Sequence, residues 1–389
     1  MMAGPGDSAA SAFDSFGGAL LQALGGGSGN TVFSPVSVGA ALLMALLGAR
    51  GSTAAQLAAA LRLASPADAG DGLRLLSAGP GERSPAAPGS PAAPGEELSF
   101  RDPYTIWVQA GLPVRPEFSR TLTGLGAAVR DADFARAPGQ ARQEINELIG
   151  KQTAGKIPNV LGPGSVTAAT RMVLASAVYL KAAWEHPFPA RATAGGQFHP
   201  GPGRTLTVPL MHLTARMRYL RADGYQAVVL PYQGRRLAMT VILPDGQPGR
   251  LGPCQDRLAA AGLAGLLAGA QPQRVRLALP RFRQQADYDL VPVLRGLGVT
   301  DAFGGQADFG AITGAERLQL GVVAHSAFID VDEYGTEAAA ATAAVAFAAA
   351  MTGGEITVLT VDRPFLFAIT DTGTGLPLFL GRVTDPPPE

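Results

Sequence analysis

Apolar runs of strand length place the strongest constraint on what this chain can fold into. Residues 172–180 and 237–243 are apolar almost throughout, a pattern typical of strands that are buried on both faces. Two shorter apolar strands are predicted at residues 365–369 and 378–380, separated by turn residues 371–375. Strands of this kind need protein on both sides of the sheet, so the chain must fold in layers around an extensive core.

Helical signals are concentrated in the first third of the chain. Residues 8–24 have apolar side chains at helical spacing and end at three glycines. Ser34 is predicted to cap a helix that begins with a proline and runs to residue 47, and Thr53 with Gln56 has the spacing of a capping box. Because helices come first and strands later, without βαβ alternation, the sequence predicts an α+β fold.

A segment rich in Pro, Ala and Gly interrupts the chain at residues 78–95. A composition of this kind cannot form a core, so we expect a mobile surface insertion there. The patterns before and after it do not form separate units, and we expect residues 1–389 to form a single domain.

The composition excludes several classes of protein. Of the 389 residues, 47% are hydrophobic, which excludes a disordered chain, and a single cysteine, Cys254, excludes a disulfide framework. The 31 basic side chains balance 31 acidic ones, so the general attraction to phosphate that nucleic-acid and membrane-surface binders use is missing. We therefore expect no nucleic-acid partner and no membrane partner.

The N-terminal residues carry no basic stretch followed by an apolar core. No apolar run in the chain reaches the roughly 18 residues of a membrane span. We expect no signal peptide and hence a cytoplasmic protein. Action outside the cell stays open, because leaderless export or a different start of translation would fit the same sequence.

Three patterns suggest enzyme chemistry, and each lacks a necessary part. Residues 150–157 nearly match a phosphate-binding loop, but Ile157 replaces the Ser or Thr whose hydroxyl binds Mg²⁺. Asp371-Thr372-Gly373 occurs once, whereas an aspartic protease needs two such carboxylates. The four histidines show no metal-ligand spacing. We expect no metal, no cofactor and no enzyme activity.

One segment near the C-terminus needs a separate explanation. Gly335, Thr336 and Glu337 lead into residues 338–351, which are mostly alanine. An alanine-rich helix is the simplest interpretation, because alanine has the highest helix propensity. The segment has no polar face, however, and two glycines follow it closely. An exposed apolar segment of this kind needs a surface to pack against.

The chain resembles the serpin family over nearly its whole length, from about residue 8 to residue 386. The resemblance is carried by separate motifs that occur in the family's order. They are residues 30–37, Ile145-Asn146 with Thr153-x-Gly155-Lys156-Ile157, residues 179–185, Phe198, residues 208–211, Leu230-Pro231-Tyr232, residues 363–367 and residues 378–383. The resemblance implies the serpin fold, with a large mixed sheet, two smaller sheets, eight or nine helices and an exposed reactive-centre loop over residues 335–354.

The same resemblance implies an inhibitor of serine-type endopeptidases that acts as a suicide substrate. In the family the loop is cleaved as bait and inserts into the large sheet, carrying the acyl-linked protease with it. The family's spacing from Glu333 puts the bait residue at Ala349 and the reactive bond at Ala349–Ala350, with cleavage after Met351 as the alternative. A small bait residue implies an elastase-like or subtilisin-like target, held in a covalent acyl complex by a monomeric inhibitor.

The resemblance also assigns roles to residues around the insertion path. Trp184 matches the breach, where insertion begins, and the shutter, where the strands must part, corresponds to Ser34, Ser37, Ser176 and His325. The hinge residues are Glu333, Gly335, Thr336, Glu337, Ala338, Ala339, Ala340 and Ala341. Small hinge side chains slide between strands, and the strand period of two directs Thr336 inward and Glu337 outward. Ser176 departs from the family's usual asparagine, and a hydroxyl offers fewer hydrogen bonds than an amide.

Two further expectations concern partners and the alternative function. The region that matches the family's heparin-binding helix offers only Arg74 and Arg83, so we expect no glycosaminoglycan site. Arg216, Arg218 and Arg221 are interpreted as a solvated strand face. The alternative function is a non-inhibitory serpin that acts as a chaperone or binding module. The departure at position 176 keeps this alternative open, whereas the small hinge residues oppose it.

Overall fold

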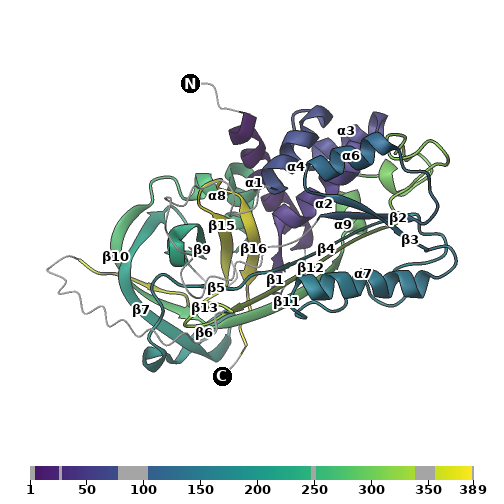
Figure 1. Ribbon diagram of the computed structural model, residues 1–389. Helices are drawn as coiled ribbons and strands as arrows, with labels where there is room; N and C mark the ends of the chain where they lie inside the picture. The colour runs from purple at the N-terminus through teal and green to yellow at the C-terminus, as the bar shows by residue number, and fades with distance from the viewer. Residues whose placement is uncertain (1–4, 26–28, 78–103, 247–250, 338–354, 388–389) are drawn as a thin grey trace, which may run out of the picture.

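The computed structural model of the protein describes residues 5–25, 29–77, 104–246, 251–337 and 355–387 (Figure 1). The insertion expected at residues 78–95 and residues 338–354 of the expected loop lie outside the described residues. Residues 335–337, the first three of that loop, lie within them.

Eight α-helices lie within the described residues, in agreement with the eight or nine expected. They are α1 (Pro5–Leu24), α2 (Pro35–Gly48), α3 (Gly51–Ala60), α4 (Ala69–Ser77), α6 (Pro116–Gly124), α7 (Pro138–Gln152), α8 (Leu251–Leu266) and α9 (Val291–Gly296). Short 3₁₀ helices are η1 (Pro66–Asp68), η2 (Ala190–Ala192), η3 (Gln233–Arg235) and η4 (Asp301–Phe303). Every residue of α2 except Leu47 is buried, as its apolar sequence requires, because α1, α3, α4 and two sheets surround it.

The large mixed sheet has seven strands and contains Gly335 and Thr336 of the expected hinge. Its order is β3 (Ala128–Ala132), β2 (Thr105–Gln109), β4 (Met172–Tyr179), β12 (Val322–Val331), β13 (Gly335–Thr336) and β5 (Ala182–Ala183), with β11 (Phe282–Asp289) also paired to β12. At the centre, β4 and β12 run parallel and pair directly, from Val322 opposite Val173 to Phe328 opposite Tyr179. The apolar run at 172–180 is therefore a central strand, as expected from its lack of charge.

The second sheet has nine strands. Its order is β1 (Thr31–Phe33), β16 (Pro377–Val383), β15 (Phe365–Asp371), β9 (Leu237–Pro244), β8 (Tyr225–Pro231), β7 (Arg204–Ala222), β10 (Gln271–Pro280) and β14 (Thr357–Thr360), with β6 (Ala194–Gly201) also paired to β7. The two smaller sheets that we expected are continuous with each other here. The 19-residue strand β7 joins them, because it pairs with β8 at one end and with β10 and β6 toward the other.

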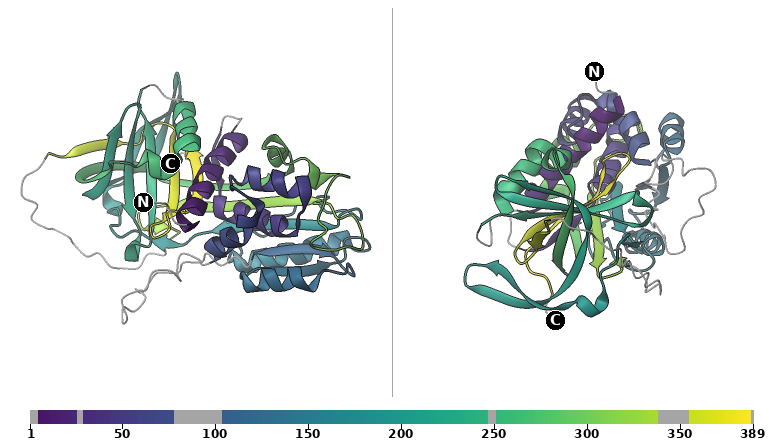
Figure 2. Two further views of the ribbon diagram at one scale, coloured as in Figure 1. Left: turned by 90° about the horizontal axis from the view of Figure 1, so that it is seen from above. Right: turned by 90° about the vertical axis from the view of Figure 1, so that its left-hand side faces the viewer.

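Helices cover the seven-stranded sheet on both faces, as Figures 1 and 2 show. On one face α7 packs Ala141, Ile145 and Ile149 against Trp107 and Val173. On the other face α1 and α2 enclose the main core, which continues into the nine-stranded sheet. Among the described residues, no helix combines the length and the apolar character needed to cross a membrane.

The capping box predicted at Thr53 and Gln56 is wrong. Helix α3 begins one turn earlier, at Gly51, and its first residues have no side-chain cap. The Thr53 hydroxyl accepts the N–H of Asp308 at 3.0 Å, and the Gln56 side-chain oxygen accepts the N–H of Thr300 at 2.9 Å. Both side chains stabilise a loop that is distant in sequence, which a local spacing rule cannot detect.

Candidate functional site

The two residues of β13 occupy a strand position at one end of the seven-stranded sheet, between β12 and β5. Thr336 pairs with Val331 of β12, and both Gly335 and Thr336 pair with β5. Glu337 continues in the same direction by donating its N–H to the carbonyl of Asp330 at 2.8 Å. The described start of the expected loop therefore runs antiparallel to β12.

The residue at position 335 must be glycine in this arrangement. Gly335 has φ = +155°, and a Cβ atom added there would lie 2.0 Å from the carbonyl oxygen of Ala182. That distance is far inside van der Waals contact, so any side chain would push β13 away from β5. The close approach of the two strands is possible because the side chain is absent.

Thr336 is fully buried and anchored by an aromatic pair. Its hydroxyl lies 2.6 Å from the hydroxyl of Tyr232, and the Tyr232 ring stacks on Trp184 with ring centroids 4.4 Å apart. Burial raises the pKa of Tyr232 far above its ordinary value, so the phenol stays protonated. The Trp184 indole N–H donates to the carbonyl of Asp332 at 2.9 Å. The expected breach residue therefore lies directly beside the hinge.

Glu333, the reference residue for the expected bait position, is a buried carboxylate paired with Arg281, whose side chain is partly exposed. The Glu333 side chain is 2% exposed, and Nε of Arg281 lies 2.8 Å from each carboxylate oxygen. The Thr193 hydroxyl donates to the same carboxylate. Burial alone would raise the pKa of Glu333, but the hydrogen bonds from Arg281 and Thr193 hold it below its ordinary value. The carboxylate is thus ionised, and it fixes the start of the expected hinge.

Glu337 forms an ion pair with Lys156, which follows α7. The Lys156 ammonium also lies 5.6 Å from the centroid of the Phe328 ring, within range of a cation–π contact. The segment that nearly matches a phosphate-binding loop therefore has a structural role here. It links the end of α7 to the hinge and to β12.

The four expected shutter residues are joined by one chain of hydrogen bonds at the centre of the sheet, and Ser37 takes part through its backbone N–H. The Ser34 N–H donates to Nε2 of His325 at 2.9 Å, and Nδ1 of His325 lies 2.9 Å from the Ser176 hydroxyl. Because Nε2 accepts, Nδ1 carries the proton and donates to Ser176. Ser37 donates its backbone N–H to the Ser34 side chain, which caps α2 as predicted. The buried Ser37 hydroxyl has no hydrogen-bond partner among the described residues.

His325 joins the two central strands in its neutral form. It lies on β12 in register with Ser176 on β4, so their side-chain bond spans the pair of strands that would have to part. Burial lowers the pKa of His325 from 6.5 to about 3. The neutral ring accepts the N–H of Ser34, and a protonated ring could not do so.

The pKa of His325 predicts how stability depends on pH. Because the folded protein binds this proton only near pH 3 and the unfolded chain binds it near 6.5, stability is complete above pH 6.5 and falls below it. Between pH 7 and pH 5 we expect wild type to lose about 2 kcal/mol more of its free energy of unfolding than His325→Asn. Urea unfolding at the two pH values measures this difference. An equal loss in both proteins would contradict it.

Several expected site residues lie outside the described residues. These are the hinge residues Ala338, Ala339, Ala340 and Ala341, the bond Ala349–Ala350, and the alternative bait Met351. Their roles remain predictions.

Sequence reasoning missed the partners that hold the hinge. Arg281 and Thr193 bind Glu333, and Lys156 binds Glu337, across separations of 52 to 181 residues. No periodicity marks such pairs. The one available signal was the position of Arg281, a basic residue directly after the apolar residues 277–280.

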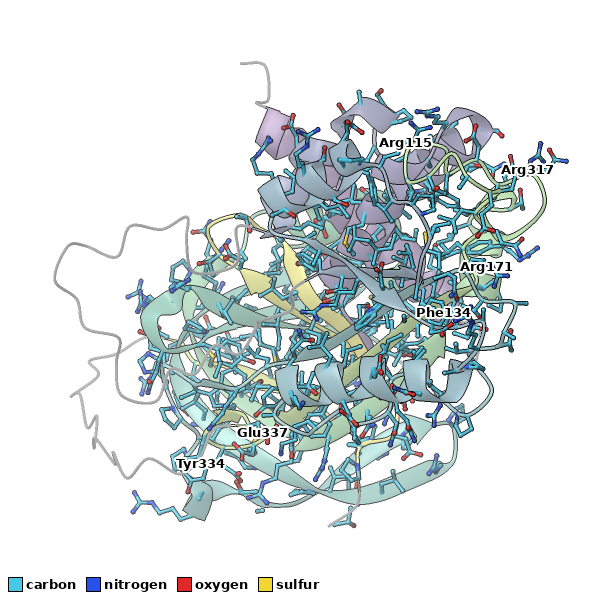
Figure 3. The ribbon with its side chains drawn as sticks, turned by 45° about the vertical axis from the view of Figure 1, so that its right-hand side comes forward. Arg115, Phe134, Arg171, Arg317, Tyr334 and Glu337 are labelled. Atoms are coloured by element: carbon cyan, nitrogen blue, oxygen red, sulfur yellow. The ribbon has the colours of Figure 1, made fainter. Side chains whose placement is uncertain are left out.

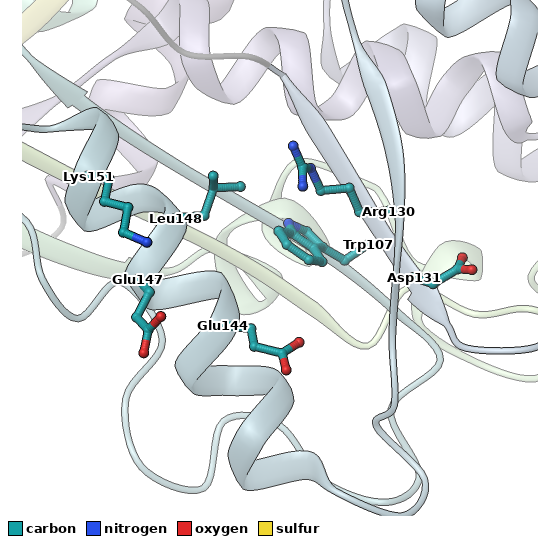
Figure 4. Close-up of a pocket in the computed structure, with 7 residues that line it drawn as sticks. All are labelled: Trp107, Arg130, Asp131, Glu144, Glu147, Leu148 and Lys151. Atoms are coloured by element: carbon teal, nitrogen blue, oxygen red, sulfur yellow. The ribbon is translucent and has the colours of Figure 1, made fainter.

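A groove of about 420 Å³ lies between α7 and strands β2 and β3 (Figure 4). Its lining side chains have mixed charge and are Trp107, Arg130, Asp131, Glu144, Glu147, Leu148 and Lys151. None of them is a predicted site residue. Within the described part of the chain, no group of three or more His, Cys, Asp or Glu side chains has the arrangement of a metal site.

Comparison with known proteins gives a consistent result. The model of the family described as Serpin (serine protease inhibitor) matches residues 11–386. An uncharacterized serpin-like protein of Thermococcus kodakarensis is 37% identical, over 96% of this chain and 85% of its own length. The leukocyte elastase inhibitor of Sus scrofa is 37% identical, over 70% of this chain and 73% of its own. The crystal structure of human thyroxine-binding globulin with its ligand superposes with a TM-score of 0.81 at 25% identity, over 99% of this chain and 100% of its own.

Proposed function

The chain belongs to the serpin family, and we propose that it inhibits a serine-type endopeptidase by acting as its suicide substrate. The observation that carries this proposal is the position of β13. Gly335 and Thr336 are already paired within the seven-stranded sheet, so the loop that follows them starts at the point where a new strand would enter. After cleavage within that loop, the residues that follow Thr336 could extend β13, because β13 is already paired with the sheet.

The register of β13 gives a path for the inserted strand. Thr336 lies opposite Val331. In an antiparallel ladder, each residue after Thr336 would pair with the residue one position earlier in β12, so Thr342 would lie opposite His325. Alternate side chains would face the core, where the alanines of the tract meet little obstruction. The expected alternation is supported at its first two positions, since Thr336 is fully buried and Glu337 is partly exposed.

Insertion would replace one ladder of backbone hydrogen bonds by two. The parallel pairing of β4 with β12 would open, and the bond between His325 and Ser176 would break. The new strand would run antiparallel to both neighbours, and antiparallel pairing is slightly more stable per residue than parallel pairing. At the register given above, the Thr342 hydroxyl would take the place of the Ser176 hydroxyl beside His325. The exchange therefore leaves no buried histidine without a partner.

The proposed reaction is arrested acyl transfer. The serine oxygen of the protease attacks the carbonyl carbon of Ala349, the bond to Ala350 breaks, and the nitrogen of Ala350 leaves with a proton. Ala349 then remains joined to the protease as an ester. About fifteen inserted residues at about 3.3 Å each would carry that ester roughly 50 Å, across the body of the inhibitor. Cleavage after Met351 is the second register.

The target that best fits a small bait residue has a shallow specificity pocket. We propose an elastase-like or subtilisin-like protease. The similarity to a relative named leukocyte elastase inhibitor supports this choice.

Incubation with pancreatic elastase or with subtilisin tests the proposal. We expect a band of summed mass that survives boiling in denaturing gel buffer, and a released peptide that begins at Ala350. The nicked inhibitor should also melt at least about 10 °C higher than the intact protein, because an added strand contributes several new backbone hydrogen bonds. Clean cleavage without a stable complex and without a gain in melting temperature would contradict the proposal.

That contradicting result would favour a second function, a non-inhibitory serpin that acts as a binding module. The similarity to human thyroxine-binding globulin supports this alternative, because that structure contains a small ligand. The hinge opposes it, since neither proline nor a bulky side chain occurs in residues 335–344.

A further inference from the structure

Four arginines share one face of strands β7 and β10. Arg216 lies directly opposite Arg274 in the antiparallel ladder, and Arg218 and Arg276 are the next residues on the same side of their strands. The intervening side chains, such as Val275, are buried in the core, so the arginines point away from it. We call this surface, formed by Arg216, Arg218, Arg274 and Arg276, the arginine face. The sequence had indicated only the β7 members, because the β10 members join them through strand pairing.

The positive charges of the arginine face are not paired with acidic side chains of the described residues. Like charges directly opposite each other on neighbouring strands are destabilising, and Arg216 and Arg274 are such a pair. Among the described residues, none of the four guanidinium groups takes part in an ion pair. The Nε atom of Arg274 is buried and makes no hydrogen bond to any described residue. The chain as a whole has a net charge of zero, so the positive charge of the arginine face is a local feature of this surface.

The arginine face borders the strand to which the proposed reactive loop returns. β14 pairs in parallel with β10 and places Val358 directly beside Arg276, on the same side of the sheet. Val358 is 59% exposed, the highest exposure of any large hydrophobic side chain among the described residues. β14 is the last strand in the order of this sheet, and Figures 1 and 2 show it, in yellow, at the outer edge. The expected bait residue Ala349 stands only six residues before Glu355, where the described chain resumes next to β14, so a protease bound at Ala349 must come close to this edge.

We propose that the arginine face, together with Val358, is a docking surface for an acidic patch on the target protease. This inference rests on the proposed function and adds a property of the target beyond its specificity pocket. Opposite charges on the two proteins would steer their encounter and raise the association rate. Val358 would supply an apolar contact within the charged surface, the combination that protein interfaces commonly use.

A matched pair of proteases tests the proposal. Pancreatic elastase and the same enzyme with its surface lysines succinylated share an active site but differ in surface charge. At about 20 mM salt we expect the inhibitor to associate with the succinylated enzyme about 10-fold faster than with the unmodified one, and the difference to vanish near 500 mM salt. Arg216→Gln with Arg274→Gln should remove most of this advantage.

The control removes the same charge elsewhere. Arg317 lies at the opposite end of the molecule from Tyr334 and Glu337 (Figure 3), and Arg120 lies on α6. Arg120→Gln with Arg317→Gln should keep the full rate advantage. Equal rates for both enzymes, or equal losses in the two double variants, would overturn the docking surface while leaving trapping intact.

Binding to inactivated protease separates this inference from the proposed function. Succinylated elastase whose serine is blocked by phenylmethylsulfonyl fluoride cannot be trapped, yet it should bind wild type about 10-fold more tightly than R216Q/R274Q at low salt. If neither enzyme is trapped but this difference persists, the proposed function fails and the docking surface stands. If R216Q/R274Q loses retention on a heparin column but the protease measurements do not change, the face is a polysaccharide site and the proposal is wrong.

Discussion

Replacing Thr336 with Arg is expected to convert the inhibitor into an ordinary substrate. The Thr336 side chain is fully buried and contacts the hydroxyl of Tyr232. A guanidinium group in that space would lose its hydration and displace Tyr232 from its stack on Trp184, at a cost of several kcal/mol. The hinge would then stay outside the sheet, and the protease would hydrolyse the ester before insertion. Each 1.4 kcal/mol added to the insertion barrier slows that step about tenfold.

The measurement for Thr336→Arg is the number of inhibitor molecules consumed per protease inactivated. We expect more than about 10 for this variant and about one for wild type. Thr336→Val is the matched control, because valine has nearly the size of threonine and loses only the hydrogen bond, worth about 1 kcal/mol. It should still form the boiling-resistant complex. A Thr336→Arg variant that traps protease at a ratio near one would refute the insertion path.

Replacing Arg281 with Met should destabilise the uncut protein by about 3 kcal/mol. The Glu333 carboxylate is almost completely buried, and loss of Arg281 would leave Thr193 as its side-chain partner in the described structure. The carboxylate would have to take up a proton or expose itself to water. Exposure would pull on the main chain, because the carbonyl of Glu333 accepts the N–H of Phe188 beside the hinge. The free energy of unfolding in urea measures the loss.

The double variant tests the cause of this loss. If an unpaired buried charge is responsible, adding Glu333→Gln to Arg281→Met should restore at least about 1 kcal/mol, because a neutral amide is far less costly to bury. Equal stability of the single and double variants would show that lost packing of the Arg281 side chain, and not its charge, stabilises the hinge.

Strand β4 and the start of α2 could be predicted from the sequence because their signals are local. The apolar run at 172–180 contains β4, and Ser34 caps α2 within three residues of its partner Ser37. The fold as a whole followed from the order of several such motifs. The prediction of a capping box at Thr53 was wrong because it used a local pattern, whereas the Thr53 hydroxyl binds a loop that is distant in sequence.

The parts of the site that could not be predicted depend on contacts between distant segments. The requirement for glycine at position 335 comes from the carbonyl of Ala182, which nothing near residue 335 reveals. The sequence likewise showed Arg216 as one residue of a solvated strand. Only the pairing of β7 with β10 places Arg274 opposite it and turns scattered charges into a surface.

The parallel pairing of β4 with β12 has a consequence for the shelf life of the active protein. If these strands separate without cleavage, an intact loop could enter the same gap, and a buried loop no longer offers bait. Inhibitory capacity would then decline during storage at the rate of strand separation, which should rise roughly 3- to 6-fold for each 10 °C of warming. Such an inhibitor is a perishable reagent, whose effective dose depends on its age as well as on its concentration.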